Sequence, residues 1–197
     1  MNSIAILVLA AGKSSRMKEI KQLLKINNKT LLEITLENAQ KVTPKNIFCV
    51  LGANASKIKA NTASKNIKYL LNKNFEDGLS SSLVCGVAYI QKNHPEFNAV
   101  LILLADQPDV DDVYLNEIIK ISLENPTKII STSYSKNAGV PAIFPAIYFE
   151  KLLTIKGDKG AKDFLQKDQF QVIKIKRKKP FLDIDTQEDY ILYKKFI

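Results

Sequence analysis

The sequence contains few of the residues on which many catalytic and structural sites depend. Its 197 residues include one histidine, two cysteines and no tryptophan. Cys49 and Cys85 form no CxxC pair and no cluster with histidine, which excludes a disulfide framework and argues against a zinc site. A mechanism with a histidine base would have to use His94, which lies in the predicted loop KNHPEF without an evident partner. We therefore expect chemistry that needs no histidine.

Long apolar runs are absent as well. The apolar segment at residues 4–11 is too short to span a bilayer, and no basic residue precedes it as in a signal peptide. We therefore expect a cytoplasmic protein with no membrane contact. A hydrophobic share of 46% and a charged share of 25% are ordinary for a globular protein. The length suits one domain over residues 1–197.

Basic residues outnumber acidic ones: the chain has 29 lysines and arginines and 20 aspartates and glutamates, which gives a net charge of +9. Such a charge can mark a nucleic-acid-binding protein. However, the lysines are scattered apart from the run KIKRKK at residues 174–179, and no recognition motif accompanies that run. We interpret the run as a solvated edge strand or turn, and expect no nucleic-acid partner.

Strand-like and helix-like segments alternate along the chain. The predicted strands cover residues 4–9, 46–51, 67–71, 99–105, 129–133 and 170–176, and the predicted helices cover 30–41, 54–63 (with Asn54 as a candidate cap), 80–91, 111–124 and 186–196. Residues 137–153 read as a short strand followed by a helix. This order predicts an α/β fold in which helices cover both faces of a mostly parallel sheet. Ligands of such sheets bind beyond the carboxyl ends of the strands, where residues 9–21, 72–82 and 104–110 would meet.

The first strand ends in small residues followed by hydroxyls and cations, in the stretch LAAGKSSRMKEIK. This stretch matches neither GxxxxGK[ST] nor GxGxxG. Ala10, Ala11 and Gly12 would still let backbone N–H groups approach an anion, and Arg16 and Lys21 are cations suited to phosphate. The alternative is an ordinary strand-to-helix turn with surface cations.

Carboxylates follow the most apolar strand and precede the last helix. Asp106, in LADQP, comes directly after the strand, where a buried charge is costly unless it is paired or bound to metal. It is therefore a candidate metal ligand, or else the cap of the next helix. Asp183 and Asp185 alternate in LDIDTQEDY and would point the same way from a strand. Asp185 or Thr186 could instead cap the final helix.

Taken together, six stretches in order resemble one protein family. LAAGKSSRMKEIKQLL resembles the loop LAAGxSxRMGxxKxLL of the MobA-like nucleotidyltransferases, and GLSSSL, LADQP, GVPAIFP, GDKGAK and DIDTQEDY follow it. The set is similar to the molybdenum cofactor cytidylyltransferase branch rather than to the guanylyltransferase branch. One position departs from the pattern, because the family's glycine after Arg-Met is Lys18 here. If that backbone is left-handed, lysine costs about 1 kcal/mol.

The resemblance implies a Rossmann-like three-layer sandwich that binds a nucleoside triphosphate with Mg²⁺ and releases pyrophosphate. The implied reaction joins CTP to a phosphorylated pterin, molybdopterin or its metal-loaded form, and a molybdenum hydroxylase or its maturation factor is a candidate protein partner. The phosphate of that pterin is largely ionised at neutral pH, so no general base is needed. The alternatives are another nucleoside triphosphate, a sugar or alditol phosphate acceptor, or a non-catalytic carrier of molybdenum cofactor.

The resemblance also implies a role for each matching residue. Lys21, Arg16 and Asp106 are the expected catalytic residues, and Asp106 and Asp185 the expected metal ligands, with Asp183 as a substitute for Asp185. The expected nucleotide-binding residues are Leu9, Ala10, Ala11, Gly12, Ser14, Gly78, Ser80, Ser81 and Ser82. The acceptor is expected to contact Gly139, Pro141, Gly157, Asp158, Gly160 and Lys162. For the acceptor stretches, two ordinary turns and a helix start are the alternative reading.

Overall fold

The computed structural model describes residues 3–17, 19–134, 137–158, 160–167, 172–177 and 181–196, except for the side chains of Asp163 and Lys167. Lys18, the position that departs from the family loop, lies outside the described residues, as does Lys159 of the GDKGAK stretch.

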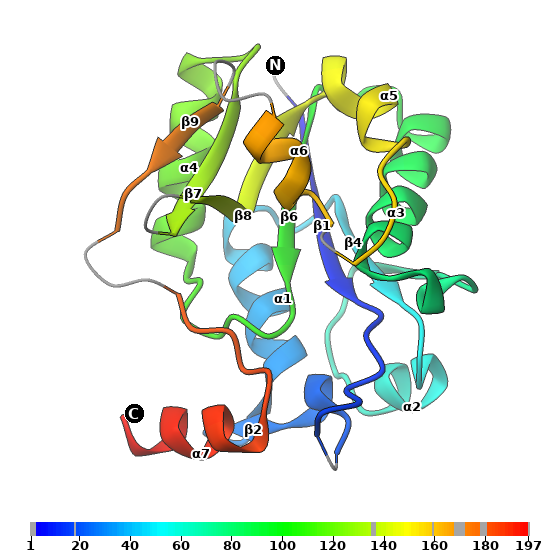
Figure 1. Cartoon of the computed structure of the whole chain (residues 1–197), viewed down its shortest axis with the longest axis vertical. Coiled ribbons are helices and arrows are strands. Elements are labelled where there is room, and N and C mark those ends of the chain that lie inside the picture. Colours follow the sequence, from blue (N-terminus) through cyan, green and yellow to red (C-terminus); the bar gives the residue numbers. More distant parts are fainter. Residues whose placement is uncertain are drawn as a thin grey trace.

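A seven-stranded sheet runs through the centre of the protein in the order β5-β4-β1-β6-β8-β7-β9 (Figure 1). Its strands are β1 (Ile4–Ala10), β4 (Ile47–Leu51), β5 (Ile67–Leu71), β6 (Ala99–Leu104), β7 (Ile129–Tyr134), β8 (Asn137–Pro145) and β9 (Val172–Ile175). β8 runs antiparallel to β6 and β7, and the other neighbours are parallel. This confirms the predicted mostly parallel sheet. β9, which carries Lys174 of the basic run, lies at an edge, as expected, whereas Lys178 and Lys179 of that run lie outside the described residues.

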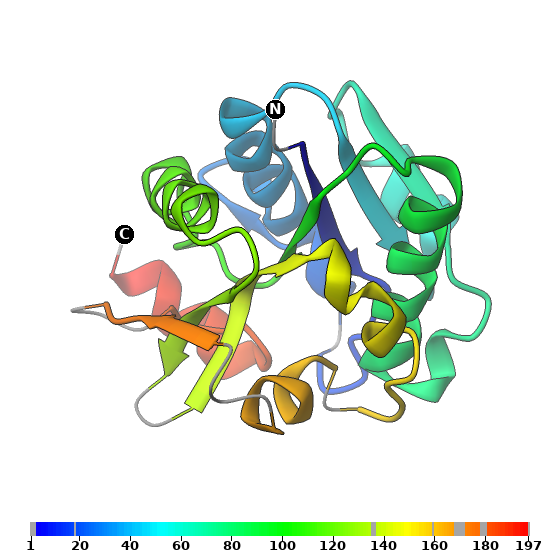
Figure 2. The same cartoon turned by 90° about the horizontal axis from the view of Figure 1, so that it is seen from above.

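Helices cover both faces of this sheet (Figure 2). They are α1 (Leu31–Val42), α2 (Ala55–Ala60), α3 (Leu79–Asn93), α4 (Asp112–Glu124), α5 (Phe149–Leu152), α6 (Lys162–Lys167) and α7 (Gln187–Lys195). Short 3-10 turns lie at Lys21–Leu23, Phe75–Asp77 and Ala146–Tyr148. A small hairpin joins β2 (Lys25–Ile26) to β3 (Lys29–Thr30). No helix in the described part of the chain combines the length and apolar character needed to cross a membrane.

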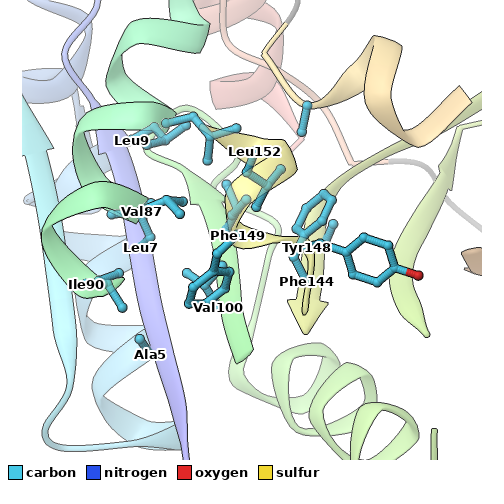
Figure 3. Packing of buried hydrophobic residues seen from close by; sticks show 14 of the residues in the cluster. Ala5, Leu7, Leu9, Val87, Ile90, Val100, Phe144, Tyr148, Phe149 and Leu152 are labelled. Carbon is cyan, nitrogen blue, oxygen red and sulfur yellow. The ribbon is translucent and has the colours of Figure 1, made fainter. Parts of the chain in front are cut away.

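The alternation of side chains along β1 divides the core in two. Leu7 and Leu9 face α3, α5 and α6, while Ile6 and Val8 face α1 and α4. Figure 3 shows the first of these clusters, in which β1 packs against α3 and α5. Both layers are buried, so the sheet is rigid and its strand ends are fixed in space.

The largest difference from the sequence prediction lies in the second half of the chain. Instead of a short strand and a helix over residues 137–153, a nine-residue strand, β8, is followed by a 3-10 turn and the four-residue α5. The pairing of β7 with β8 shifts between Ser131 and Thr132, which leaves Val140 and Pro141 out of the ladder. This bulge lets the strand continue past a proline that cannot donate to it.

The helix starts were predicted with mixed success. Thr30 and Thr186 each form a capping box, with Glu33 and Asp189 respectively. The expected cap at Asn54 is wrong, because Asn54 adopts a left-handed backbone with φ of 59° and its side chain makes no capping hydrogen bond. The hairpin β2–β3 was not predicted, and α6 was anticipated only by the helix start in the alternative reading of the acceptor stretches.

Candidate active site

The three stretches expected at the strand ends do meet, and they line a polar cavity of about 670 Å³. Residues 11–16 and Lys21 come from the loop after β1, residues 75, 76, 78, 79 and 82 follow β5, and residues 104 and 106 come from the end of β6. The second half of the chain adds Asp158, Asp183 and Asp185. Cations and carboxylates therefore share one hollow at the carboxyl edge of the sheet.

Lys21 lies at the centre of the charged groups. Its Nζ is 2.6 Å from Asp106 Oδ2 and 2.8 Å from Asp185 Oδ1, and its side chain is 17% exposed. Burial disfavours the ammonium, but the charges and hydrogen bonds of Asp106 and Asp185 outweigh it and raise the pKa of Lys21 above its ordinary value. Lys21 is therefore a fixed positive charge at neutral pH.

Arg16 is held much more loosely than Lys21. Its guanidinium lies 3.6 Å from Asp185 Oδ2, and its side chain is 68% exposed. Such a long, exposed ion pair contributes little to stability. The side chain is therefore free to turn toward an anion in the cavity.

The backbone of the loop after β1 is held by hydrogen bonds from Gln22, a residue that sequence reasoning missed. Gln22 is buried, and its Nε2 donates to the carbonyl oxygens of Ala10 and Gly12 at 2.9 and 3.1 Å. Ser14 has a left-handed φ of 57°, and its hydroxyl donates to Gln22 and accepts from the backbone N–H of Lys21. The Ser14 hydroxyl is thus used to shape the loop. The backbone N–H groups of residues 11–14 donate to no other described residue.

The GLSSSL stretch begins α3 and borders the same cavity. Gly78 precedes the helix with a φ of 91°, and a Cβ there would lie 2.3 Å from Asp158 Oδ1, so only glycine fits. Of the three serines, only Ser82 lines the cavity, while the Ser81 hydroxyl donates to the Gly78 carbonyl. Asn72, which the sequence did not single out, is buried and donates to the hydroxyls of Ser81 and Ser82. Ser80 is buried and does not line the cavity.

A second, mainly apolar cavity of about 290 Å³ adjoins the first, and the two share Leu79, Leu104 and Asp183. Its walls come from β1, β6 and α3, from the β7–β8 pair, and from α6 with the residues just before it. Its other lining residues are Leu9, Leu83, Ile102, Gln107, Tyr134, Asn137, Ala138, Gly139, Val140, Gly160, Ala161, Lys162 and Leu165.

The expected acceptor residues divide between the two cavities. Gly139, Gly160 and Lys162 line the apolar cavity, whereas Asp158 lines the polar one. Pro141 and Gly157 line neither cavity, although the Gly157 carbonyl accepts from the Ser80 backbone N–H and thereby ties this loop to α3. On the nucleotide side, Leu9 lines the apolar cavity and Ala10 lies beneath the loop, outside both.

A family model described as the MobA-like NTP transferase domain matches residues 6–172. The chain belongs to the MobA-like nucleotidyltransferases. It is 27% identical to a probable molybdenum cofactor guanylyltransferase of Flavobacterium johnsoniae, over 98% of this chain and 91% of the relative. It is 28% identical to nicotine blue oxidoreductase of Paenarthrobacter nicotinovorans, over 92% of this chain and 91% of the relative.

Solved structures share the fold over nearly the full length of the chain. The crystal structure of Rv0371c from Mycobacterium tuberculosis matches with a TM-score of 0.85 and 28% identity over 98% of both chains. A second crystal structure of Rv0371c, a complex with manganese, matches with a TM-score of 0.82 and 26% identity over all of both chains.

The polar cavity of this MobA-like nucleotidyltransferase fits a divalent metal ion that the substrate helps to bind. Within the described ranges, no three His, Cys, Asp or Glu side chains lie close enough to hold a metal by themselves. However, Asp106 Oδ1 is buried and has no hydrogen-bond partner among the described residues. Mg²⁺ is usually bound by one or two carboxylates together with substrate phosphates. Asp106 and Asp185 can supply these carboxylates.

Proposed function

We propose that this MobA-like nucleotidyltransferase transfers a cytidylyl group from CTP to the phosphate of a molybdopterin-type pterin, with Mg²⁺ as its cofactor. The observation that carries the proposal is the pair of adjoining cavities. One is charged and suits a triphosphate, the other is apolar and suits a ring system, and they share a wall. A relative named as a probable molybdenum cofactor guanylyltransferase supports the class of acceptor. The motifs GLSSSL and LADQP support CTP.

The chemical step is a displacement at the α-phosphorus of CTP. An ionised oxygen of the acceptor phosphate forms the new P–O bond, the bond to the β-phosphate breaks, and pyrophosphate leaves with the electron pair. No proton has to be removed from the nucleophile, because the second pKa of such a phosphate is about 6. Bound Mg²⁺, held by Asp106 and Asp185, would neutralise charge on the phosphates.

The protein's own groups position the reactants and balance their charge. Lys21 is buried beside both carboxylates and stabilises the negative charge that develops as pyrophosphate departs. Arg16 is exposed and grips the outer phosphates with its forked guanidinium. Lys162, at the start of α6, meets the phosphate of the acceptor in the apolar cavity.

Thermal denaturation with CTP, GTP, ATP and UTP, each with Mg²⁺, tests the choice of base. A ligand at 100 times its dissociation constant stabilises a folded protein by about 2.7 kcal/mol, so the preferred nucleotide should stand out. We expect CTP to give the largest shift in melting temperature. GTP is the second candidate, because the Flavobacterium johnsoniae relative is named a guanylyltransferase. A larger shift with GTP would replace CTP in the proposal.

Pyrophosphate release then tests the reaction. With CTP and Mg²⁺ we expect release only when molybdopterin is added. Tight binding of molybdopterin with no release for any of the four nucleotides would favour a carrier of the cofactor over an enzyme.

A further inference from the structure

The wall between the two cavities contains a buried amide to which the proposed reaction gives no role. Gln107 follows Asp106 in the LADQP stretch, lines the apolar cavity and is 3% exposed. A glutamine this buried has to satisfy two N–H donors and one carbonyl oxygen. Where its hydrogen bonds go therefore defines what the wall offers to a ligand.

The structure fixes the orientation of the Gln107 amide twice. Its Nε2 donates to Asp183 Oδ1 at 2.7 Å, and a carboxylate accepts. The same Nε2 donates to the Tyr134 hydroxyl at 3.0 Å. The Tyr134 hydroxyl group has a single hydrogen, which it donates to the Val140 carbonyl at 2.6 Å. The hydroxyl oxygen is therefore the acceptor in its hydrogen bond with Gln107. Both N–H groups of the amide therefore donate to acceptors. A flipped amide, with Oε1 in the position of Nε2, would place an acceptor against these two acceptors.

This arrangement is built into the fold. The Tyr134 ring lies against Gly139 of the GVPAIFP stretch, where a Cβ would come within 2.9 Å of the ring. A glycine at 139 therefore lets Tyr134 reach Gln107, and the pairing of β7 with β8 holds the two strands together. The amide is positioned before any ligand arrives.

The carbonyl oxygen of the Gln107 side chain, Oε1, is the one polar atom of this amide not yet accounted for. It is buried and has no hydrogen-bond partner among the described residues. Beside it, the Asp183 carboxylate lines both cavities and accepts a hydrogen bond from Gln107. Gln107 and Asp183 both line the apolar cavity, so this part of its wall contains two side chains that can accept hydrogens, and Gln107 does so through an Oε1 atom that is covered in the free protein. A buried acceptor without a partner is unfavourable, so a ligand that supplies an N–H is preferred to one that does not.

We propose that Gln107 determines the specificity for the acceptor, with its Oε1 and the Asp183 carboxylate receiving N–H groups from one edge of a flat nitrogen heterocycle. Leu83, Ile102 and Leu165 provide apolar surface for the ring, and Lys162 provides a cation for an anionic substituent. The inference rests on the proposed function, since it names the features of the acceptor that this cavity selects. It also assigns Asp183 to the acceptor rather than to the metal, which leaves Asp185 as the second carboxylate of the metal site.

Equilibrium binding of two small pteridines tests this inference. The probes are pterin, whose pyrimidine ring carries an amino group, and lumazine, in which a carbonyl oxygen replaces that group. Quenching of their fluorescence gives the dissociation constants. We expect the wild-type protein to bind pterin at least about 10-fold more tightly than lumazine, because lumazine places an acceptor against acceptors. Gln107→Met should weaken pterin binding by about 10-fold and lumazine binding by less than about 2-fold.

Controls separate selectivity from a general disturbance of the fold. Gln91→Met makes the same replacement on α3, at a residue that lines neither cavity, and should leave both affinities unchanged. Stabilisation by CTP with Mg²⁺ should stay near the wild-type value in Gln107→Met. If that variant does not fold, Tyr134→Phe keeps Gln107 and removes one of its two anchors, and should reduce the preference for pterin by a few fold.

The outcomes are distinct. If wild-type protein binds neither pteridine, the proposed pterin acceptor is overturned, and the inference with it. If wild-type protein binds pterin and lumazine equally, or if Gln107→Met and Tyr134→Phe both keep the wild-type preference, the inference fails while the proposed function stands. An equal loss for both pteridines and for CTP would make Gln107 a structural residue and would also overturn the inference.

Discussion

The polar and the apolar cavity share a wall but are built by different parts of the chain. The loops after the parallel strands β1, β5 and β6 supply most of the polar cavity, whereas the antiparallel pair β7–β8 and the helix α6, with the two residues before it, supply most of the apolar one. Parallel strand ends bring backbone N–H groups and charged side chains to one edge, which suits phosphates. The antiparallel half instead forms a pocket of carbon atoms with a few fixed polar groups, which suits recognition of a ring.

This comparison separates chemistry from selectivity. Substitutions in the polar cavity should change turnover and leave the affinity for a pterin in place. Substitutions in the apolar cavity should change the use of the acceptor and leave CTP binding in place. Asp183 is the charged residue among the three that line both cavities, and we expect its replacement to affect both turnover and pterin binding.

Replacement of Asp106 should have the largest effect. Asp106→Asn keeps the shape of the side chain, but removes the charge that pairs with Lys21 at 2.6 Å and the carboxylate offered to the metal. We expect kcat to fall on the order of 10²-fold or more, because charge neutralisation by the metal depends on this group. Pyrophosphate release measures the loss. Pterin binding should be unchanged, and turnover close to that of the wild type would remove Asp106 from the mechanism.

Replacement of Lys21 should have the next largest effect. Lys21→Ala removes the buried ammonium that we place beside the breaking bond, and we expect kcat to fall between about 10-fold and 10²-fold. The KM for CTP should rise less than kcat falls, because the interaction strengthens in the transition state. Steady-state kinetics measure both constants. An increase in KM alone would make Lys21 a binding residue.

Lys21→Ala should lower kcat but strengthen the binding of a metal ion to the free protein. Lys21 Nζ occupies one oxygen of Asp106 and one of Asp185, the two carboxylates assigned to the metal. Without this ammonium, both carboxylates are left without their main cation. We therefore expect Lys21→Ala to bind Mn²⁺ more tightly than the wild type in the absence of nucleotide, as measured by electron paramagnetic resonance. Weaker binding would indicate that the metal does not use these carboxylates.

Much of the polar cavity could be predicted from the sequence, because its residues follow buried strands. The runs before Ala10 and Asp106 are so apolar that they have to be central strands, and parallel strands bring their ends together. What could not be predicted is what holds the loops in place. Gln22 and Asn72 are polar residues whose importance comes from burial, and burial depends on contacts with segments distant in the sequence.

The apolar cavity was much harder to predict. Residues 137–153 contain two prolines, which suggested a short strand, and the bulge that tolerates Pro141 depends on pairing with β7. The assignment of Asp158 to the polar cavity and of Leu9 to the apolar one depends on how the two halves pack. Local patterns carry no signal for such contacts.

Replacement of Lys162 tests whether the apolar cavity binds the acceptor independently of the nucleotide. Lys162→Ala should weaken acceptor use by about 10-fold, as expected for the loss of one charged contact to a phosphate, and should leave the affinity for CTP unchanged. Lys156→Ala is the matched control, since Lys156 precedes the same helix but lines neither cavity. The KM for molybdopterin measures the use of the acceptor, and thermal stabilisation by CTP measures the affinity for the nucleotide. An equal loss of both affinities would place Lys162 with the nucleotide.

Replacement of Arg16 should have the smallest effect and bears on how the polar cavity holds its ligand. Arg16 is 68% exposed and its ion pair with Asp185 is long, so its removal costs the free protein little. We propose that it grips the outer phosphates of CTP equally in the ground state and the transition state. Arg16→Ala should therefore raise the KM for CTP several-fold, roughly 5-fold to 10-fold, with little change in kcat. Arg16→Lys should recover only part of this loss, because an ammonium cannot make two parallel hydrogen bonds. Full recovery by lysine would show that charge alone is needed, and a fall in kcat without a change in KM would move Arg16 to the breaking bond, beside Lys21.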